Sequence, residues 1–178
     1  MFREVLHFWF EEIEPRQRFM RDDGFDQLLK ERFGALLQQA SRCELSSWRR
    51  GARGRLAEII VLDQFSRNIY RETPAAFAQD PLALALAQEA ILHDALNDLD
   101  ESERSFLLMP YMHSESAVIH AEAEMLFRDF AAPSSYEYEL KHKAIIDRFG
   151  RYPHRNVILG RESSAEELAF LQQPGSSF

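Results

Sequence analysis

The sequence predicts an all-α protein of about seven to nine helices. Three observations predict this class. Apolar residues recur at intervals of three and four along most of the chain, glycines and prolines fall between these periodic segments, and no alternating run of β-branched residues is bounded by turns. The 178 residues suffice for one substantial core. No linker or change of composition divides them, so we expect a single domain over residues 1–178.

The first half of the chain contains three predicted helical segments. Residues 2–12 form a short amphipathic helix that Pro15 ends. Residues 22–40 place apolar side chains at helical spacing. The segment 46–54, rich in arginine and glycine, breaks this pattern, and residues 55–70 are then the most apolar part of the chain. Because a helix that is apolar on nearly every side is normally buried, we expect residues 55–70 to form the central helix.

The second half begins with cap residues that stand directly before prolines. Thr73-Pro74 and Asp80-Pro81 both show this order, which is a strong signal for the start of a helix. The predicted helices of this half are 81–96, one that opens at a capping box formed by Asp100 and Glu103, 114–130, 135–149, and 164–172 with a serine cap.

Composition and charge limit the possible functions. The net charge is −8 and the isoelectric point is about 5.3, which argues against broad binding to nucleic acid or to anionic membranes, since both need a basic face. Cys43 is the one cysteine, so an intramolecular disulfide and a cysteine-based zinc site are both impossible. No signal peptide is visible, and no stretch approaches the ~18 apolar residues of a membrane span. We therefore expect a soluble, cytoplasmic protein.

Two charged residues lie within the most apolar segment. Asp63 and Arg67 are four residues apart, so the same face of a helix carries both. Burying such charges is costly unless they are paired and hydrogen-bonded. Two interpretations stay open: an internal salt bridge that ties helices together, or one wall of a pocket.

Histidines supply the next candidates. On the helix predicted over 114–130 and extended back to His113, the side chains of His113, His120 and Glu124 project within about 40° of one another. The spacing of His120 and Glu124 suits a metal, but two ligands from one helix are too few, and no metal is predicted. His142 falls on the apolar face of its own helix, where it is either a core residue or part of a site.

A basic segment lies near the C-terminus. "RFGRYPHRNVILGR", residues 148–161, combines four arginines and a histidine with two glycines and a proline. Gly150 is well placed to end a helix in the left-handed conformation, and the proline stiffens the loop that follows. A stiff loop holds side chains at fixed positions, and arginine suits bidentate binding of phosphate or carboxylate. The segment therefore predicts a site for a small anionic group.

A structural interpretation of the same loop stays open. Arg151 and Arg155 would then pair with acids such as Asp63 and Glu115 and fasten the loop to the central helix. Because an unpaired buried charge is strongly destabilising, such pairing would explain these charges without any ligand.

Three segments, taken together, resemble a known family. "LDQFSRNIYRETPAAFAQDPLALALAQEAI", "LLMPYMHSES" and "RFGRYPHRNVILGRESSAEELAFL" occur in this order, after "VLHFWF" near the start. They look like the bacterial family called domain of unknown function 924, whose members share a Leu-Asp-Gln-Phe-x-Arg-Asn block, a Met-His-Ser-Glu block and a Phe-Gly-Arg-aromatic-Pro-His-Arg-Asn block. The resemblance covers nearly the whole chain. It implies a tetratricopeptide-like right-handed α–α superhelix and leaves the activity open.

The resemblance also marks the charged and polar residues of these blocks as the candidate site. We predict ligand binding by Asp63, Arg67, Asn68, His113, Glu115, His142, Arg151, His154, Arg155 and Asn156. Gln64, Ser114 and Arg161 complete the family blocks.

The sequence thus predicts a helical protein that binds a small anionic ligand or an acidic peptide in a polar cleft formed by the blocks 63–68, 113–115 and 151–156. Two alternatives stay open. The same residues form a structural salt-bridge network in a protein-interaction scaffold, or a small-molecule enzyme uses a histidine as acid or base. No cofactor, nucleic-acid partner or membrane partner is expected. The oligomeric state and any catalytic residue are left open.

Overall fold

The computed structural model describes residues 1–177, and all regular secondary structure in this range is helical, as predicted. The α-helices are α1 (Phe2–His7), α2 (Asp23–Ser41), α3 (Ala52–Ile60), α4 (Ser66–Ile69), α5 (Asp80–Leu92), α6 (Glu101–Met112), α7 (Ala117–Phe130), α8 (Pro133–Phe149) and α9 (Ala165–Leu171). Shorter helical turns join them: the π-helical η1 (Phe8–Glu12) and η4 (Val61–Phe65), and the 3₁₀ turns η2 (Pro15–Arg18), η3 (Ser46–Arg50), η5 (Pro74–Ala76), η6 (Ala95–Asp98) and η7 (Pro153–Arg155).

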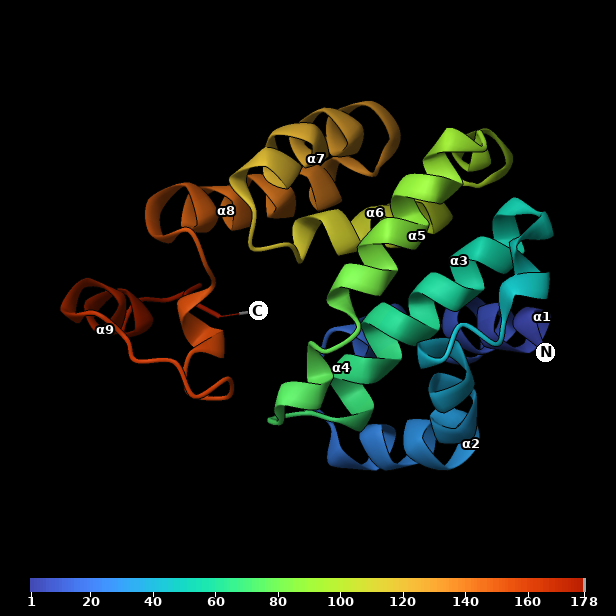
Figure 1. Cartoon of the computed structure of the whole chain (residues 1–178), viewed down its shortest axis with the longest axis horizontal. Helices are drawn as coiled ribbons and strands as arrows, with labels where there is room; N and C mark the ends of the chain where they lie inside the picture. The colour runs from blue at the N-terminus through green and yellow to red at the C-terminus, as the bar shows by residue number, and fades with distance from the viewer. Residues whose placement is uncertain (178) are drawn as a thin grey trace.

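The centre of the fold is one continuous helical rod formed by α3, η4 and α4. Helices α1, α2, α5 and α6 pack around this rod (Figure 1). Leu56, Ile59, Ile60, Leu62 and Phe65 are all completely buried on it. The segment was predicted to be central because it is apolar on nearly every side, and this is confirmed.

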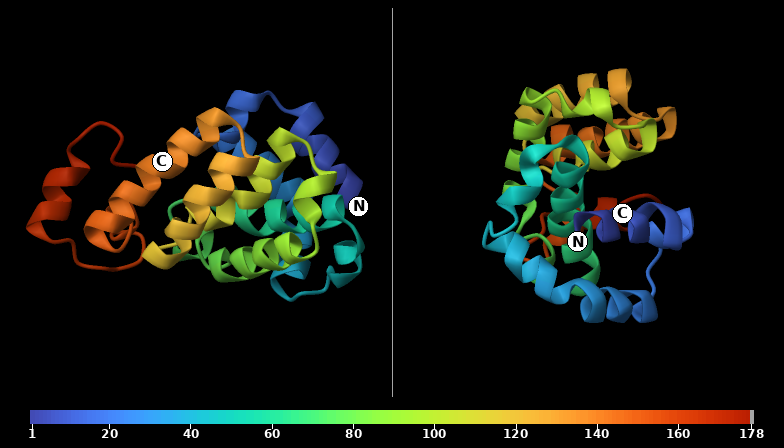
Figure 2. Two further views of the ribbon diagram at one scale, coloured as in Figure 1. Left: turned by 90° about the horizontal axis from the view of Figure 1, so that it is seen from above. Right: turned by 90° about the vertical axis from the view of Figure 1, so that its right-hand side faces the viewer.

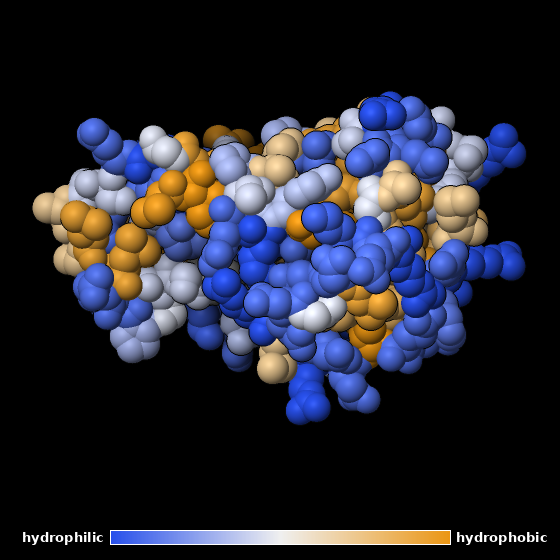
Figure 3. All heavy atoms as spheres, turned by 90° about the horizontal axis from the view of Figure 1, so that it is seen from below, coloured by the Kyte–Doolittle hydropathy of each residue, from blue (hydrophilic) through white to orange (hydrophobic). Residues whose placement is uncertain are grey.

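The last third of the chain, α7 to α9, forms an arm that begins where α7 packs against α6 and reaches beyond the body through α8 and α9 (Figure 1). Helices α7 and α8 are joined by only two residues and pack against each other as a hairpin, and α9 lies at the far end from the N-terminus (Figures 1 and 2). Apolar side chains are exposed near α9, where Leu168 is 55% exposed (Figure 3).

Side-chain caps define several helix ends as the sequence predicted. Asp100 and Glu103 form the capping box of α6, and Ser164 and Glu167 form that of α9. Gly150 ends α8 with φ of +69°, a conformation that glycine adopts without steric cost.

Several observed helices differ in extent from the predicted ones. The central rod begins at Ala52 rather than at residue 55, and α8 begins at Pro133 rather than at residue 135. The helix expected over 81–96 ends at Leu92, because Asp94 adopts a left-handed conformation with φ of 57° and the chain continues as η6. The helix expected from residue 114 begins at Ala117, because residues 113–116 form a corner between α6 and α7. Thr73-Pro74 opens only the short turn η5. The corner carries the second motif block, residues 113–115.

Among residues 1–177, no helix combines the length and the apolar character needed to span a bilayer.

Candidate functional site

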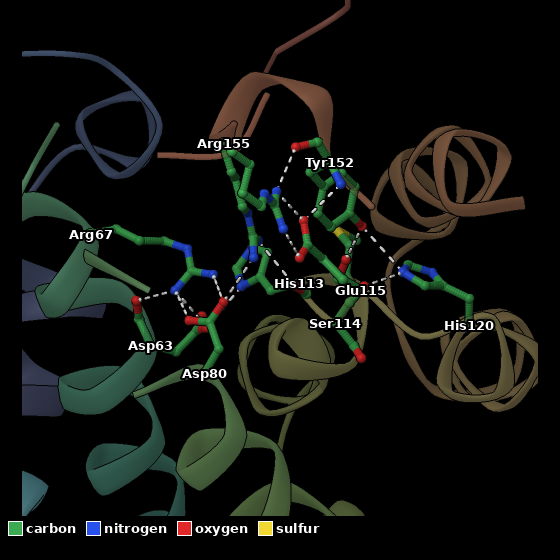
Figure 4. A network of polar contacts seen from close by, with 11 residues as sticks. Asp63, Arg67, Asp80, His113, Ser114, Glu115, His120, Tyr152 and Arg155 are labelled. Atoms are coloured by element: carbon green, nitrogen blue, oxygen red, sulfur yellow. Dashed lines mark hydrogen bonds and ion pairs between the residues drawn. The ribbon is translucent and has the colours of Figure 1, made fainter. Parts of the chain in front are cut away.

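Polar residues from distant parts of the sequence meet where α6 ends and the chain turns toward α7 (Figure 4). They come from η4 and α4, from the start of α5, from the α6–α7 corner, and from the loop after α8. We call the cluster formed by Asp63, Arg67, Asp80, His113 and Arg155 the central polar cluster.

Asp63 is the most deeply buried acid of this cluster, with 1% of its surface exposed. It lies on the π-helical turn η4, a type of distortion that is frequent at functional sites. Its carboxylate accepts a hydrogen bond from the Gln64 amide at 2.6 Å, lies 2.8 Å from Nδ1 of His113, and pairs with Arg67 at 3.1 Å. Burial alone would raise the pKa of Asp63, but the charge of Arg67 and the contact with His113 outweigh it and hold that pKa well below its usual range.

Asp80 bridges two arginines. Arg67 donates to both of its carboxylate oxygens at 2.9 and 3.0 Å, and Arg155 donates to one of them at 3.1 Å. The sequence predicted Asp80 as the cap of α5, and this is wrong: Gln79 is the N-cap residue, and no side chain caps this helix. The carboxylate points to the two guanidinium groups instead, each of which brings a full positive charge and N–H donors that suit a carboxylate.

Arg155 is packed between aromatic rings and is 6% exposed. Its guanidinium carbon lies 4.5 Å from the centre of the Phe77 ring and 4.7 Å from that of Tyr152. One Nη atom donates to the carbonyl of His113 at 3.0 Å. Its Nε atom is buried and has no hydrogen-bond partner among residues 1–177. The arginine therefore joins the C-terminal loop to the body and retains one unused donor.

His113 is fixed by a contact on one side of its ring. Because the Asp63 carboxylate accepts, the contact with Nδ1 places the imidazole proton on that atom. Nε2 makes no hydrogen bond within residues 1–177, and the side chain is 15% exposed. Burial and the charge of Arg67 lower the pKa of His113, although Asp63 opposes them. The imidazole is therefore neutral at neutral pH and presents the Nε2 lone pair as a proton acceptor.

Glu115 organises the loop after α8. Its carboxylate accepts two hydrogen bonds from Arg161 at 2.6 and 2.8 Å and one from the backbone N–H of Tyr152 at 2.7 Å. Burial alone would raise the pKa of Glu115, but these hydrogen bonds lower it. Arg161 also donates to the side chain of Asn156 at 2.9 Å. Glu115 and Arg161 thus tie the two ends of the loop to the α6–α7 corner.

A second buried cluster surrounds Tyr152. The Tyr152 hydroxyl donates to the carbonyl of Met112 at 2.5 Å and lies 3.2 Å from Nε2 of His120. His120 contacts the carbonyl of Ser114 at 2.9 Å and the carboxyl of Glu139 at 2.7 Å. Burial raises the pKa of Glu139. These contacts fasten the α6–α7 corner to α8 and to the loop beyond it. Asp80, Glu139 and Tyr152 could not be assigned to these contacts from the sequence, because an acid beside a proline, an acid on a helix face and a tyrosine in a loop carry no local signal of distant partners.

The prediction that His113 shares a face with His120 and Glu124 is wrong, whereas His120 and Glu124 do lie four residues apart on α7. His113 is the C-cap residue of α6 and contacts Asp63, whereas His120 on α7 faces Glu139. The chain changes direction at the corner between α6 and α7. Side-chain directions calculated for one continuous helix therefore do not apply across it.

The predicted partners of Arg151 and Arg155 are also wrong. Neither residue pairs with Asp63 or Glu115. Arg151 pairs with Glu167 of α9, and Arg155 forms the bridge described above. The pairing of Asp63 with Arg67 is confirmed.

The remaining predicted site residues lie outside the central polar cluster. Asn68 donates to Asp26 on α2, Nδ1 of His142 contacts the carbonyl of Tyr138, the His154 ring packs against Tyr152, and Asn156 donates to Ser163. His142 lies on the core side of α8, as its helical position predicted. Burial lowers the pKa of His142 to about 3 and that of His154 to about 4, so both are neutral at neutral pH.

Acid is expected to release α9 from the loop after α8. Arg151 donates two hydrogen bonds to Glu167, at 2.7 and 2.8 Å. These bonds lower the pKa of Glu167 to about 2, because they outweigh the burial of Glu167, which alone would raise it. Because this lies below the ordinary value of 4.5, the pairing stabilises the fold fully above pH 4.5 and is lost as the pH falls toward 2. Amide exchange protection of residues 165–171 should fall across that window. In Glu167→Gln it should be low already at neutral pH and change little with acid. If acid lowered the exchange protection equally in the wild type and in Glu167→Gln, the pair of Arg151 and Glu167 would not be what holds α9.

Two surface hollows lie elsewhere on the molecule. One of about 180 Å³ lies between α2 and the segment around η5, and one of about 500 Å³ lies where α1, η3 and α3 meet. None of the residues that line them belongs to the central polar cluster.

Comparison with known proteins identifies the family. The model of the family described as bacterial protein of unknown function (DUF924) matches residues 5–175. The chain belongs to this family. The solved structure of the protein of unknown function ATU0120 from Agrobacterium tumefaciens is similar to it, with 35% sequence identity, a TM-score of 0.91 and 96% of each chain covered. No match was found among curated proteins.

Proposed function

We propose that the protein binds a small anionic molecule at the exposed edge of the central polar cluster and that Nε2 of His113 accepts a proton from it. One observation carries this proposal: the contact between the ionised Asp63 and Nδ1 of His113, which orients a neutral imidazole with Nε2 unused by residues 1–177. A neutral imidazole oriented in this way presents the lone pair that a general base needs.

The neighbouring arginines support an anionic ligand. Arg67 and Arg155 lie beside His113, and a guanidinium stabilises the negative charge that remains when a proton is removed. The Nε–H of Arg155 supplies a buried donor that residues 1–177 leave unused. A buried donor of this kind calls for a partner, and an anionic oxygen is a suitable one.

A structural role is the second candidate, and a different observation favours it. Asp63 and Asp80 carry two negative charges, and Arg67 and Arg155 carry two positive charges, so the central polar cluster neutralises itself. On this alternative the cluster only holds the C-terminal arm on the body, and the protein serves as an interaction scaffold.

A thermal-shift panel distinguishes the two candidates. The probes are inorganic phosphate, dicarboxylates, nucleotides, acidic peptides and divalent metals. A ligand at 100 times its Kd adds about 2.7 kcal/mol to stability, which raises Tm by roughly 2–4 °C for a chain of this size. We expect an anion to raise Tm by this amount in the wild type but not in His113→Gln. It should also raise Tm in Arg151→Ala, because in the wild type the guanidinium of Arg151 is engaged by Glu167 and is not available to the ligand. If no anion shifts Tm and His113→Gln alone lowers it, the structural role is favoured.

The tautomer of His113 gives a direct test of the base. We expect ¹⁵N NMR at pH 7 to show a protonated Nδ1 and an unprotonated Nε2 for His113. In Asp63→Asn this preference should weaken, because an amide can offer either a donor or an acceptor to Nδ1. A proton on Nε2 in the wild type would contradict the proposal.

We further propose a tetratricopeptide-like superhelix and a cytoplasmic location in a bacterium. The helical hairpin of α7 and α8 supports the superhelix. An exposed, unpaired Cys43 suits a reducing compartment, and the family is described as bacterial.

A further inference from the structure

The hollow of about 500 Å³ lies far from the central polar cluster, at the end of the molecule that carries the N-terminus (Figure 1). Its walls come from α1, η3, the start of α3 and η6. Ligand pockets typically enclose about 300–1,000 Å³. We call it the Trp48 hollow, after the largest side chain that lines it.

Two aromatic rings form one wall of the Trp48 hollow. The rings of Phe2 and Trp48 lie 6.1 Å apart and are inclined at 59°. Both are only partly buried, so part of each ring is open to solvent. Tilted aromatic pairs of this spacing offer a planar ligand both a face and an edge to pack against.

Positive charge lines another side. Arg50 is exposed and forms no ion pair within residues 1–177, and Arg53, whose side chain is 65% exposed, contacts Glu103 at 3.1 Å. Asp98 also lines the hollow, and Glu103 engages Arg53, so Arg50 is the lining arginine whose charge is left for a ligand by residues 1–177. Arginine is suited to phosphate and carboxylate and also stacks on planar rings.

The position of Trp48 is set by the backbone. The carbonyl oxygen of Trp48 lies directly against Gly54 in the first turn of α3, at a place where a Cβ would come within 2.0 Å of it. Only glycine allows this approach. The backbone of Trp48 is therefore held against α3, and the indole packs against Phe2 in the wall of the hollow.

We propose that the Trp48 hollow binds a small molecule that joins an aromatic ring to a phosphate or carboxylate. The ring packs against Phe2 and Trp48, and the anionic group pairs with Arg50. This site is separate from the proposed function and does not depend on it.

Phenyl phosphate is the probe that combines both features. Phenol supplies the ring alone and inorganic phosphate the charge alone. The chain has two tryptophans, and Trp9 is completely buried, so the indole N–H signal of Trp48 in ¹H–¹⁵N NMR reports on the hollow while that of Trp9 serves as an internal reference. Trp48→Phe assigns the two signals. We expect phenyl phosphate to shift the Trp48 signal saturably, with a Kd at least about tenfold below that for phenol or for phosphate.

Two matched variants test the charge. Arg50→Ala should weaken phenyl phosphate binding about tenfold, whereas Arg42→Ala should leave it unchanged, because Arg42 is also an exposed arginine but does not line the hollow. His113→Gln should also leave it unchanged, which separates this site from the central polar cluster. The proposal is overturned by the absence of a saturable shift, by equal weakening in Arg50→Ala and Arg42→Ala, or by loss of binding in His113→Gln.

Discussion

Replacing Asp63 with asparagine is expected to lower the free energy of unfolding by about 3–5 kcal/mol. Asp63 is buried, ionised, and in contact with Gln64, Arg67 and His113. In this variant Asp80 is the one carboxylate among residues 1–177 that still pairs with Arg67, and the side-chain amide of the asparagine accepts hydrogen bonds only at its oxygen. Urea unfolding followed by circular dichroism measures the loss as a change of midpoint at constant slope.

Asp129→Asn is the matched control. Asp129 pairs with Arg128 at 2.8 Å, a distance as short as the contact between Asp63 and His113, but its side chain is 49% exposed. Exposed ion pairs contribute about 0–1 kcal/mol, so this variant should be nearly as stable as the wild type. A loss for Asp63→Asn no larger than that of the control would contradict a charged, structurally important Asp63. It would also remove the basis for the orientation of His113.

The helices could be predicted because their signals are local. The apolar residues of 55–70, the capping box of Asp100 and Glu103, and Gly150 after α8 each act within one or two turns of the chain. The ends that were wrong lie where the backbone leaves the helix for tertiary reasons. Asp94 adopts a left-handed conformation, and the 113–116 corner turns toward α7.

The candidate site could be predicted only in part. The pair of Asp63 and Arg67 follows from a spacing of four residues on one helix. Asp80 next to a proline has the local pattern of a cap, and only the fold brings it between two arginines that are distant in sequence. Which acid meets which arginine is a property of helix packing, and a single sequence carries no local signal for it.

Gly54→Ala is expected to destabilise the protein by about 3 kcal/mol. The added Cβ would lie 2.0 Å from the carbonyl oxygen of Trp48, and both partners are held in place. Gly54 is buried in the first turn of α3, and Trp48 belongs to η3. Because the opposing atom is backbone, no side-chain rotation relieves the clash, and η3 has to move away from α3. Thermal and urea unfolding measure the loss.

Gly34→Ala provides the opposite case. Gly34 lies in the interior of α2, and a Cβ there would meet only the flexible Lys30 side chain at 3.9 Å. Alanine favours a helix interior over glycine by about 1 kcal/mol, so this variant should be more stable than the wild type. The same added methyl group is therefore expected to lower the stability at position 54 and to raise it at position 34. The difference between the two variants isolates the contact between α3 and η3. Stabilisation by both substitutions would mean that η3 does not press against α3 in solution, and the wall of the Trp48 hollow would then lack its backbone support.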